Sequence, residues 1–149
     1  MHASSEGGPA LFRLVRHWAR QWAPDVVERF AAGAPASWTV PNLFVIQAID
    51  GAAGEEVTVA DVAHQLGIDR SVASRMVAEA AREGFVVRST STRDARRAVL
   101  TLTDAAKEFL DASQAHQRQA FEALVGHWPE EDRERFAGYL RRLADEVLG

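Results

Sequence analysis

The residues best suited to chemistry are arginines and serines that recur along residues 70–83. At about 100° per residue, Arg70, Ser71, Ser74 and Arg75 fall on one side of a helix, and valine, alanine and methionine occupy the other side. Guanidinium and hydroxyl groups donate hydrogen bonds to base edges and phosphates in the major groove of DNA. An ordinary amphipathic surface helix shows the same division, so this segment alone leaves both interpretations open.

A second basic cluster lies in the segment STSTRDARR, at residues 89–97. It contains Arg93, Arg96 and Arg97, and its flanks are rich in Val, Phe, Leu and Thr, as β-strands prefer. The pattern predicts a hairpin whose tip suits a minor groove, where the negative potential favours arginine. Asp94 would repel phosphate if it were unpaired, so we expect it to orient Arg96. The alternative is a solvated loop.

The elements that would position these side chains can be predicted from their ends. Thr58 with Asp61 three residues later is typical of a capping box, which starts a helix that runs to Leu66. Gly67 ends this helix, because a residue without a Cβ adopts the left-handed conformation easily. A turn, the helix 70–83 and the hairpin then complete a winged helix-turn-helix at about residues 42–103.

The run VADVAHQLGIDRSVASRMVAEAAREGFVVRSTSTRDARRAVLTLTDAA resembles the multiple-antibiotic-resistance-regulator (MarR) family of bacterial transcription factors. The resemblance covers both helices, the Asp-x-Arg-Arg loop and the Leu-Thr before the next helix. It implies a mainly α fold with a small β-hairpin wing, flanked by N- and C-terminal dimerisation helices. It also implies a homodimer that binds a palindromic operator in double-stranded DNA and is released by a small molecule or another signal.

The outer helices are expected at about residues 10–32 and 104–148, and each carries an apolar stripe. Pro24 is expected to kink or end the first of them near Ala23. The stripes could pack on each other within a monomer. A two-fold dimer is favoured, because two recognition helices one DNA turn apart, about 34 Å, need a rigid bridge.

Length and composition bound the remaining possibilities. The chain has 149 residues, and we expect a flexible tail at residues 1–9 and a single domain at residues 10–149. It lacks the run of about 18 apolar residues typical of a membrane span, so we expect no membrane contact. Residues 1–9 lack the basic start and apolar stretch of a signal peptide, which favours a cytoplasmic protein. The absence of cysteine excludes disulfides and thiolate metal sites.

The charge is unevenly distributed. Residues 70–97 contain seven arginines against Glu79, Glu83 and Asp94, a formal charge of +4 in a chain whose net charge is −4. The rest of the chain therefore carries −8. A basic surface on an acidic body is typical of a protein that binds DNA in one orientation.

Other kinds of site find little support. Asp61 with His64, or Glu108 and Asp111 with His116, could hold a metal only loosely, and solvated helix faces are the better interpretation. No nucleophile turn and no Gly-rich phosphate loop occurs, so we expect neither an enzyme nor a cofactor. The resemblance also implies a pocket for a small aromatic or amphipathic effector, for which the candidate residues are His17, Trp18, Trp22, Trp38 and Phe44. Aromatic residues at helical spacing are more often core than ligand pocket.

A rival interpretation from another class is a winged-helix module that binds a protein partner and no DNA. Its apolar Val, Phe and Leu surfaces would form the interface, and the arginines would only keep it soluble. Salt dependence separates the two, because DNA binding weakens steeply as salt rises.

Overall fold

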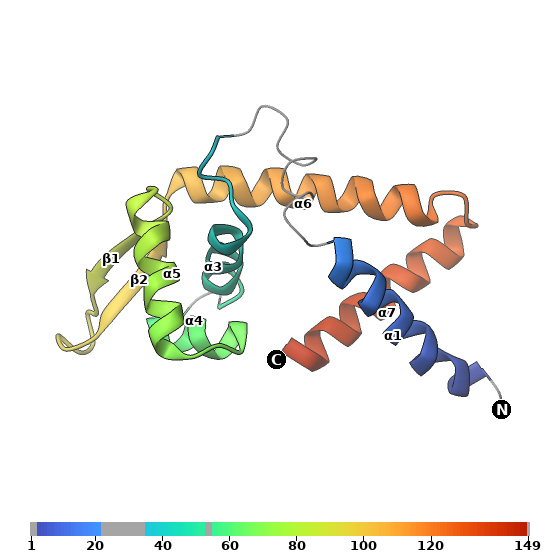
Figure 1. The fold of residues 1–149 in the computed structure, drawn as a ribbon, viewed down its shortest axis with the longest axis horizontal. Coiled ribbons are helices and arrows are strands. Elements are labelled where there is room, and N and C mark those ends of the chain that lie inside the picture. The colour runs from blue at the N-terminus through green and yellow to red at the C-terminus, as the bar shows by residue number, and fades with distance from the viewer. Residues whose placement is uncertain (1–2, 22–34, 53–54, 149) are drawn as a thin grey trace. The chain divides into compact units, whose positions relative to one another are not determined.

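The computed structural model describes residues 3–21, 35–52 and 55–148. The chain divides into two compact units, Met1–Thr39 and Val40–Gly149. Figure 1 shows the elements in chain order. The helices are α1 (Ala3–Gln21), α3 (Val40–Asp50), α4 (Val59–Leu66), α5 (Arg70–Arg82), α6 (Asp104–Val125) and α7 (Glu130–Leu148), and the strands are β1 (Val86–Thr90) and β2 (Ala98–Leu102). None of the helices within these described ranges is both long and apolar enough to cross a membrane.

The first unit contains α1, which starts earlier than the sequence predicts. The helix begins at Ala3 rather than near residue 10, and it includes Pro9. Glu6 lies in its first turn, where a negative charge stabilises a helix N-terminus. Trp18 is 39% exposed, and Leu11, Leu14 and Val15 on the same helix are more exposed still. The predictions for Pro24 and for the rest of the segment 22–32 lie outside the described residues.

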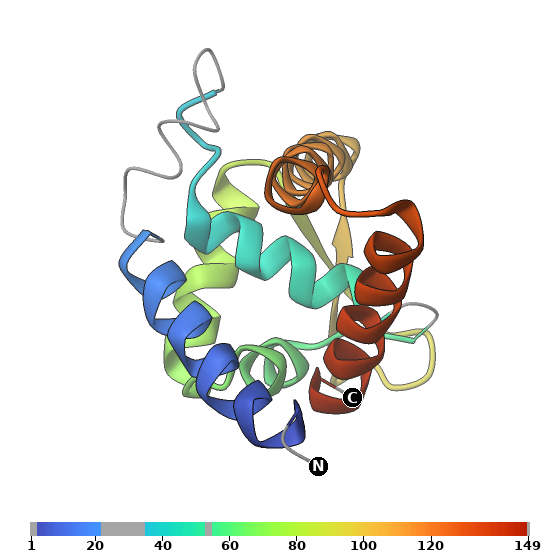
Figure 2. The same cartoon turned by 90° about the vertical axis from the view of Figure 1, so that its right-hand side faces the viewer.

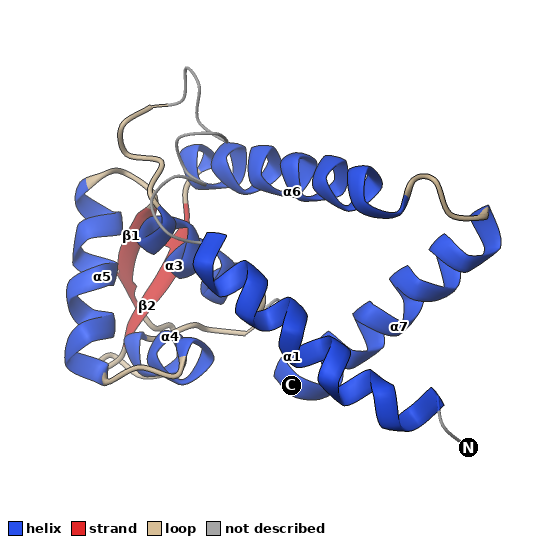
Figure 3. Cartoon of the chain, turned by 45° about the vertical axis from the view of Figure 1, so that its right-hand side comes forward, coloured by secondary structure: helices blue, strands red, loops and turns tan. Residues whose placement is uncertain are grey.

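The second unit is built around a winged helix-turn-helix, as predicted. Its hydrophobic core contains the fully buried side chains of Val45, Ile46, Val62, Val77, Leu100 and Phe109. They come from α3, α4, α5, β2 and α6, and α3 contacts each of the other four. Figure 3 shows the small two-stranded sheet against these helices. The fold class, mainly α with a β-hairpin wing, is therefore confirmed.

Helix α4 begins and ends where its residues predict, and α5 begins at Arg70 as predicted but ends at Arg82, one residue before the expected end. The Thr58 amide donates to Asp61 Oδ2 at 2.8 Å, and the Asp61 amide donates to Thr58 Oγ1 at 3.3 Å, which forms the capping box. Gly67 ends α4 with φ 64°, in the left-handed region. Its amide and that of Ile68 donate to carbonyl oxygens of α4, so the turn into α5 is fixed by backbone hydrogen bonds.

The long helix α6 leaves the wing and α7 turns back from its end. Thr103 caps α6, because its Oγ1 accepts from the Ala106 amide at 3.3 Å. At the other end the rings of Phe121 and Phe136 stack with centroids 5.9 Å apart, and Arg133 Nη1 lies 2.7 Å from Glu122 Oε1. Figure 2 looks almost along α6 and shows α7 descending from its end.

The capping box makes a prediction about stability and pH. The hydrogen bond from the Thr58 amide lowers the pKa of Asp61 below its ordinary value of 3.8. A lowered pKa means that the folded protein binds the Asp61 proton less readily than the unfolded chain does, so this stabilisation is complete well above 3.8 and is lost as the pH falls through the folded pKa. We expect Thr58→Ala to lower the free energy of unfolding by about 1 kcal/mol at pH 7.

The matched control is Asp69, the N-cap of α5, whose side chain makes no capping hydrogen bond. Asp69→Ala should change the free energy of unfolding by no more than about 0.5 kcal/mol. Urea denaturation of both variants at pH 7 and near pH 3 measures the effect. An equal loss from both substitutions, or a loss for Thr58→Ala that grows at low pH, would contradict this account of the capping box.

Candidate nucleic-acid interface

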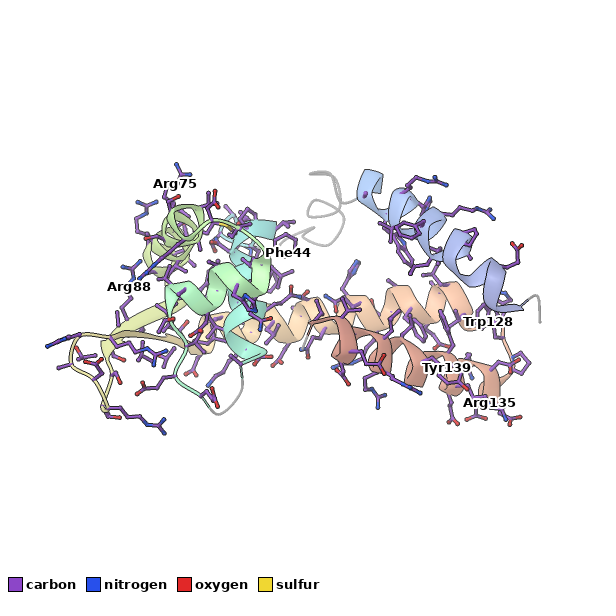
Figure 4. The ribbon with its side chains drawn as sticks, turned by 90° about the horizontal axis from the view of Figure 1, so that it is seen from below. Phe44, Arg75, Arg88, Trp128, Arg135 and Tyr139 are labelled. Carbon is purple, nitrogen blue, oxygen red and sulfur yellow. The ribbon has the colours of Figure 1, made fainter. Side chains whose placement is uncertain are left out.

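Helix α5 presents the predicted polar face to solvent. Arg70, Ser71, Ser74 and Arg75 are all exposed. On the opposite face Ala73, Val77 and Ala80 are fully buried against the core. Figure 4 shows Arg75 pointing away from this lobe. The exposed face can therefore enter a groove without any rearrangement of the helix.

The hairpin forms with the predicted antiparallel pairing. Val86 pairs with Leu102, Arg88 with Leu100, and Thr90 with Ala98. The loop between the strands is closed by the Ser91 amide, which donates to the Arg97 carbonyl at 2.9 Å, and by the Arg97 amide, which donates to the Asp94 carbonyl at 3.0 Å. Its side chains Arg93, Arg96 and Arg97 are exposed. Two backbone hydrogen bonds thus define a short loop with three guanidinium groups on its surface.

The Asp94 side chain contacts the backbone amide of Arg96 and not its guanidinium group. The Arg96 amide donates to Asp94 Oδ1 at 3.0 Å. The carboxylate therefore fixes the backbone of the loop tip, and no ion pair with a guanidinium group is recorded for Asp94 within the described residues. This geometry leaves the three arginine side chains available to a ligand. The wing-orienting role of Asp94 stays a prediction.

Sequence reasoning missed the residues that anchor this loop, Ser91 and Glu56. Ser91 is only 7% exposed, and its Oγ donates to Glu56 Oε2 at 2.6 Å. The same oxygen accepts from the amides of Arg93 at 3.0 Å and Asp94 at 3.2 Å. A serine ahead of a turn is typical of such local bonds. Nothing in the local sequence could indicate Glu56, which lies 35 residues earlier.

We expect Ser91→Ala to loosen the wing without unfolding the protein. The substitution removes the acceptor of two amides and the donor to Glu56, and each lost hydrogen bond costs about 1 kcal/mol. Hydrogen exchange of the Arg93 and Asp94 amides should become faster, whereas exchange in α3 should be unchanged. Ser89→Ala, on the exposed part of β1, is the matched control. Equal exchange at both amides in the wild type and in Ser91→Ala would contradict the anchoring role.

The arginines of this lobe differ in their partners. Arg82 on α5 forms an ion pair with Glu79, which raises the pKa of Arg82 through a side-chain hydrogen bond. Away from the lobe, Arg133, Arg135 and Arg142 pair with Glu122, Glu131 and Glu146. Within the residues that the structure describes, no carboxylate forms an ion pair with the remaining arginines of residues 70–97, namely Arg70, Arg75, Arg88, Arg93, Arg96 and Arg97. Arg97 lies near enough to Asp61 for its charge to help lower the pKa of that carboxyl group, but none of the six arginines is held in an ion pair within the described residues.

The candidate effector residues are spread over the two units. His17 and Trp18 lie on α1, and Trp38 lies in the same unit, just before α3. Phe44 is half-buried on α3 in the second unit. Trp22 lies outside the described residues. A pocket formed by this set stays a prediction. Across the described parts of the chain, no group of three or more His, Asp or Glu side chains could hold a metal ion.

The part of the chain that carries these arginines also resembles known proteins. The family model described as "MarR family" matches residues 39–97. The chain is 26% identical over 85 residues to YxaD of Bacillus subtilis (strain 168), named as an uncharacterised HTH-type transcriptional regulator; the match spans 57% of this chain and 59% of that relative.

Two solved structures of MepR from S. aureus have the same fold. The MepR–DNA complex gives a TM-score of 0.61 at 20% identity, covering 93% of this chain and 98% of that one. MepR bound to ethidium bromide gives a TM-score of 0.61 at 18% identity, covering 93% and 95%. At this level of identity the likeness establishes the fold of the chain.

Proposed function

The chain belongs to the MarR family through its winged helix-turn-helix, and from this premise we propose that it is a sequence-specific, DNA-binding transcriptional regulator. It acts in the cytoplasm as a repressor that a small molecule releases from its operator. The family and fold are those of transcriptional regulators, and the proposal includes no catalytic activity and no cofactor.

The observation that carries the proposal is the set of exposed arginines on one lobe that form no ion pair within the described residues. Helix α5 packs directly against β1, so the exposed face of α5 and the wing belong to one continuous structural element. Arg70, Ser71, Ser74 and Arg75 contact base edges and phosphates in the major groove. Arg93, Arg96 and Arg97 serve the wing, with Asp94 holding the loop that carries them. The acidic remainder of the chain favours binding through this lobe alone.

We propose that the regulator is a homodimer on a palindromic operator. Large apolar side chains are exposed on α1 and α7, among them Leu140 at 41%, Leu143 at 44% and Val147 at 71%. Each such side chain contributes about 1.5–3 kcal/mol when fully buried. A second copy of the chain would bury them and would supply the second recognition helix that a palindrome requires.

The dimer predicts a mass in solution of twice the 16.3 kDa of the chain. Leu143→Arg places a charge in the apolar stripe of α7 and should convert the dimer to monomer, measured by sedimentation equilibrium. Arg142→Gln, on the same helix and paired with Glu146, is the control and should leave the dimer intact. A wild-type mass of one chain at micromolar concentration would contradict dimerisation.

The effector is proposed to be a small aromatic or amphipathic molecule. MepR was solved with ethidium bromide bound, and this chain offers His17, Trp18, Trp22, Trp38 and Phe44 as candidates for a similar role. An effector should quench or shift tryptophan fluorescence and weaken operator binding over the same concentration range. Molecules that change neither property are not effectors, and finding none in a broad aromatic set would remove this part of the proposal.

Selection from a pool of random DNA duplexes tests the function itself. The full-length protein should enrich a two-fold symmetric sequence with half-site centres about 10 base pairs apart, or a multiple of one turn. Enrichment of no sequence, together with equal weak binding to every duplex, would contradict the regulator and favour a winged-helix module that binds a protein partner.

A further inference from the structure

The wing carries a shallow, open surface that combines the predicted Arg96 and Arg97 with Arg88, which no predicted site includes. Its volume is about 300 Å³, and its lining includes Arg88, Thr90, Arg96, Arg97 and Ala98. We call this surface the wing hollow. It brings Arg88 of β1 together with two loop arginines. None of its described lining residues is acidic.

The register of the hairpin explains why the hollow is open. Side chains alternate between the two faces of a strand, so Arg88 and Thr90 of β1 share a face with their partners Leu100 and Ala98 of β2. Leu100 is buried in the core, whereas Ala98, nearer the tip, is exposed. Because Ala98 has only a methyl side chain, Thr90 has no large cross-strand neighbour at this pair. Arg88 is itself exposed, and Figure 4 shows it pointing outward from the same lobe as Arg75.

The chemistry of the hollow fits a phosphate group. A guanidinium group offers only hydrogen-bond donors, in a planar fork that matches phosphate oxygens. Three arginines are among the residues that line this one surface, and Arg88 forms no ion pair with a carboxylate among the described residues. A phosphate presents acceptors alone.

We propose that the wing hollow binds one backbone phosphate of the operator, with Arg88 donating from the strand and Arg96 and Arg97 from the loop. This inference rests on the proposed function and assigns Arg88 to the interface. It also assigns the wing arginines to two different contacts, because Arg96 and Arg97 line the hollow and Arg93 does not. Arg96 and Arg97 position the wing on the backbone, and Arg93 remains for the minor groove.

The test compares two variants of the hollow with a matched control. Arg88→Gln should weaken binding to specific and non-specific DNA alike, by about tenfold, and should reduce the slope of log K against log salt by about 0.9. Ala98→Leu keeps every charge but places a larger side chain in the hollow. Like Arg88→Gln, it should weaken binding to both specific and non-specific DNA. Arg82→Gln removes a guanidinium group already paired with Glu79 and should change neither quantity. Thermal melts establish that each variant is folded.

The outcomes separate this inference from the proposed function. If the wild type shows no DNA binding above that of a neutral protein, the regulator itself is contradicted. If the wild type binds DNA and Arg88→Gln does not change the salt slope, only the phosphate site is overturned. A loss with Arg88→Gln but none with Ala98→Leu would mean that Arg88 acts through long-range charge, which also overturns the hollow.

A free phosphate ion could accept the same hydrogen bonds in the hollow as a backbone phosphate. Inorganic phosphate can be titrated at constant ionic strength while the Nε–H resonance of Arg88 is followed by NMR. Saturable binding of phosphate together with unchanged DNA affinity in Arg88→Gln would assign the hollow to a small anion and contradict its role in DNA binding. Chemical-shift changes that stay small and do not saturate, together with the losses of DNA affinity described above, support binding of a backbone phosphate.

Discussion

Arg75→Ala is expected to weaken binding of the operator by about 1–3 kcal/mol, which is the contribution of one good bidentate base contact. Arg75 is exposed on the polar face of α5, and its guanidinium group forms no ion pair with a carboxylate among the described residues. The loss should be much larger for the operator than for non-specific DNA. Base preference should relax at one position of each half-site, measured by binding to a set of single-base operator variants.

Arg82→Ala is the matched control for this substitution. It removes the same charge from the same helix, but Arg82 is occupied by its ion pair with Glu79. We expect little change in affinity and none in base preference. If Arg75→Ala altered neither affinity nor preference, or if Arg82→Ala had the larger effect, the assignment of the recognition face would be wrong.

Phe109→Ala is expected to have the largest effect on stability, about 3–5 kcal/mol. Phe109 is 1% exposed, and its ring lies 5.6 Å from the ring of Phe85. The substitution leaves a cavity at the point where α6 packs on the hairpin and α3. Denaturant titration measures the loss, and DNA binding should fall with the folded fraction.

Leu124→Ala provides the comparison on the same helix, because Leu124 is 55% exposed. Its effect on the stability of the isolated chain should be below about 1 kcal/mol, since little apolar surface is lost from the core. A loss for Phe109→Ala no greater than that for Leu124→Ala would contradict the core described for the second unit.

The helix-turn-helix could be predicted closely because its ends depend on local chemistry. The capping box of Thr58 with Asp61 and the left-handed Gly67 each act within four residues, so the sequence alone places both ends of α4. The two faces of α5 follow from a regular helical period. Burial of Ala73 and Val77 and exposure of Arg70 and Arg75 agree with that period.

The anchoring of the wing could not be predicted, because it depends on contacts between distant segments. Glu56, which accepts the hydrogen bond from Ser91, directly precedes Val57, whose bridge to Leu100 joins this segment to the hairpin. No local pattern encodes that pairing. Arg88 was missed for a related reason. Its strand position indicated only β-structure, whereas its place in the wing hollow depends on the register that sets it near Ala98.

The start of α1 could not be predicted from the composition of residues 1–9. Residues 1–9 are small and polar and include two glycines and a proline, which favoured a flexible tail over a helix. The structure places residues 3–9 in α1. Helix propensity is a weak prior, and the composition of a short segment carries even less information.

Binding of the purified protein to the DNA upstream of its own gene, measured at about 50 and 200 mM salt against a shuffled duplex of equal length, tests the central claim most directly. A regulator that uses six or more phosphate contacts should lose roughly a thousandfold or more in affinity between the two conditions and should prefer the upstream DNA at both. Equal affinity for the two duplexes, or binding insensitive to salt, would contradict specific recognition of DNA through the arginines of α5 and the wing.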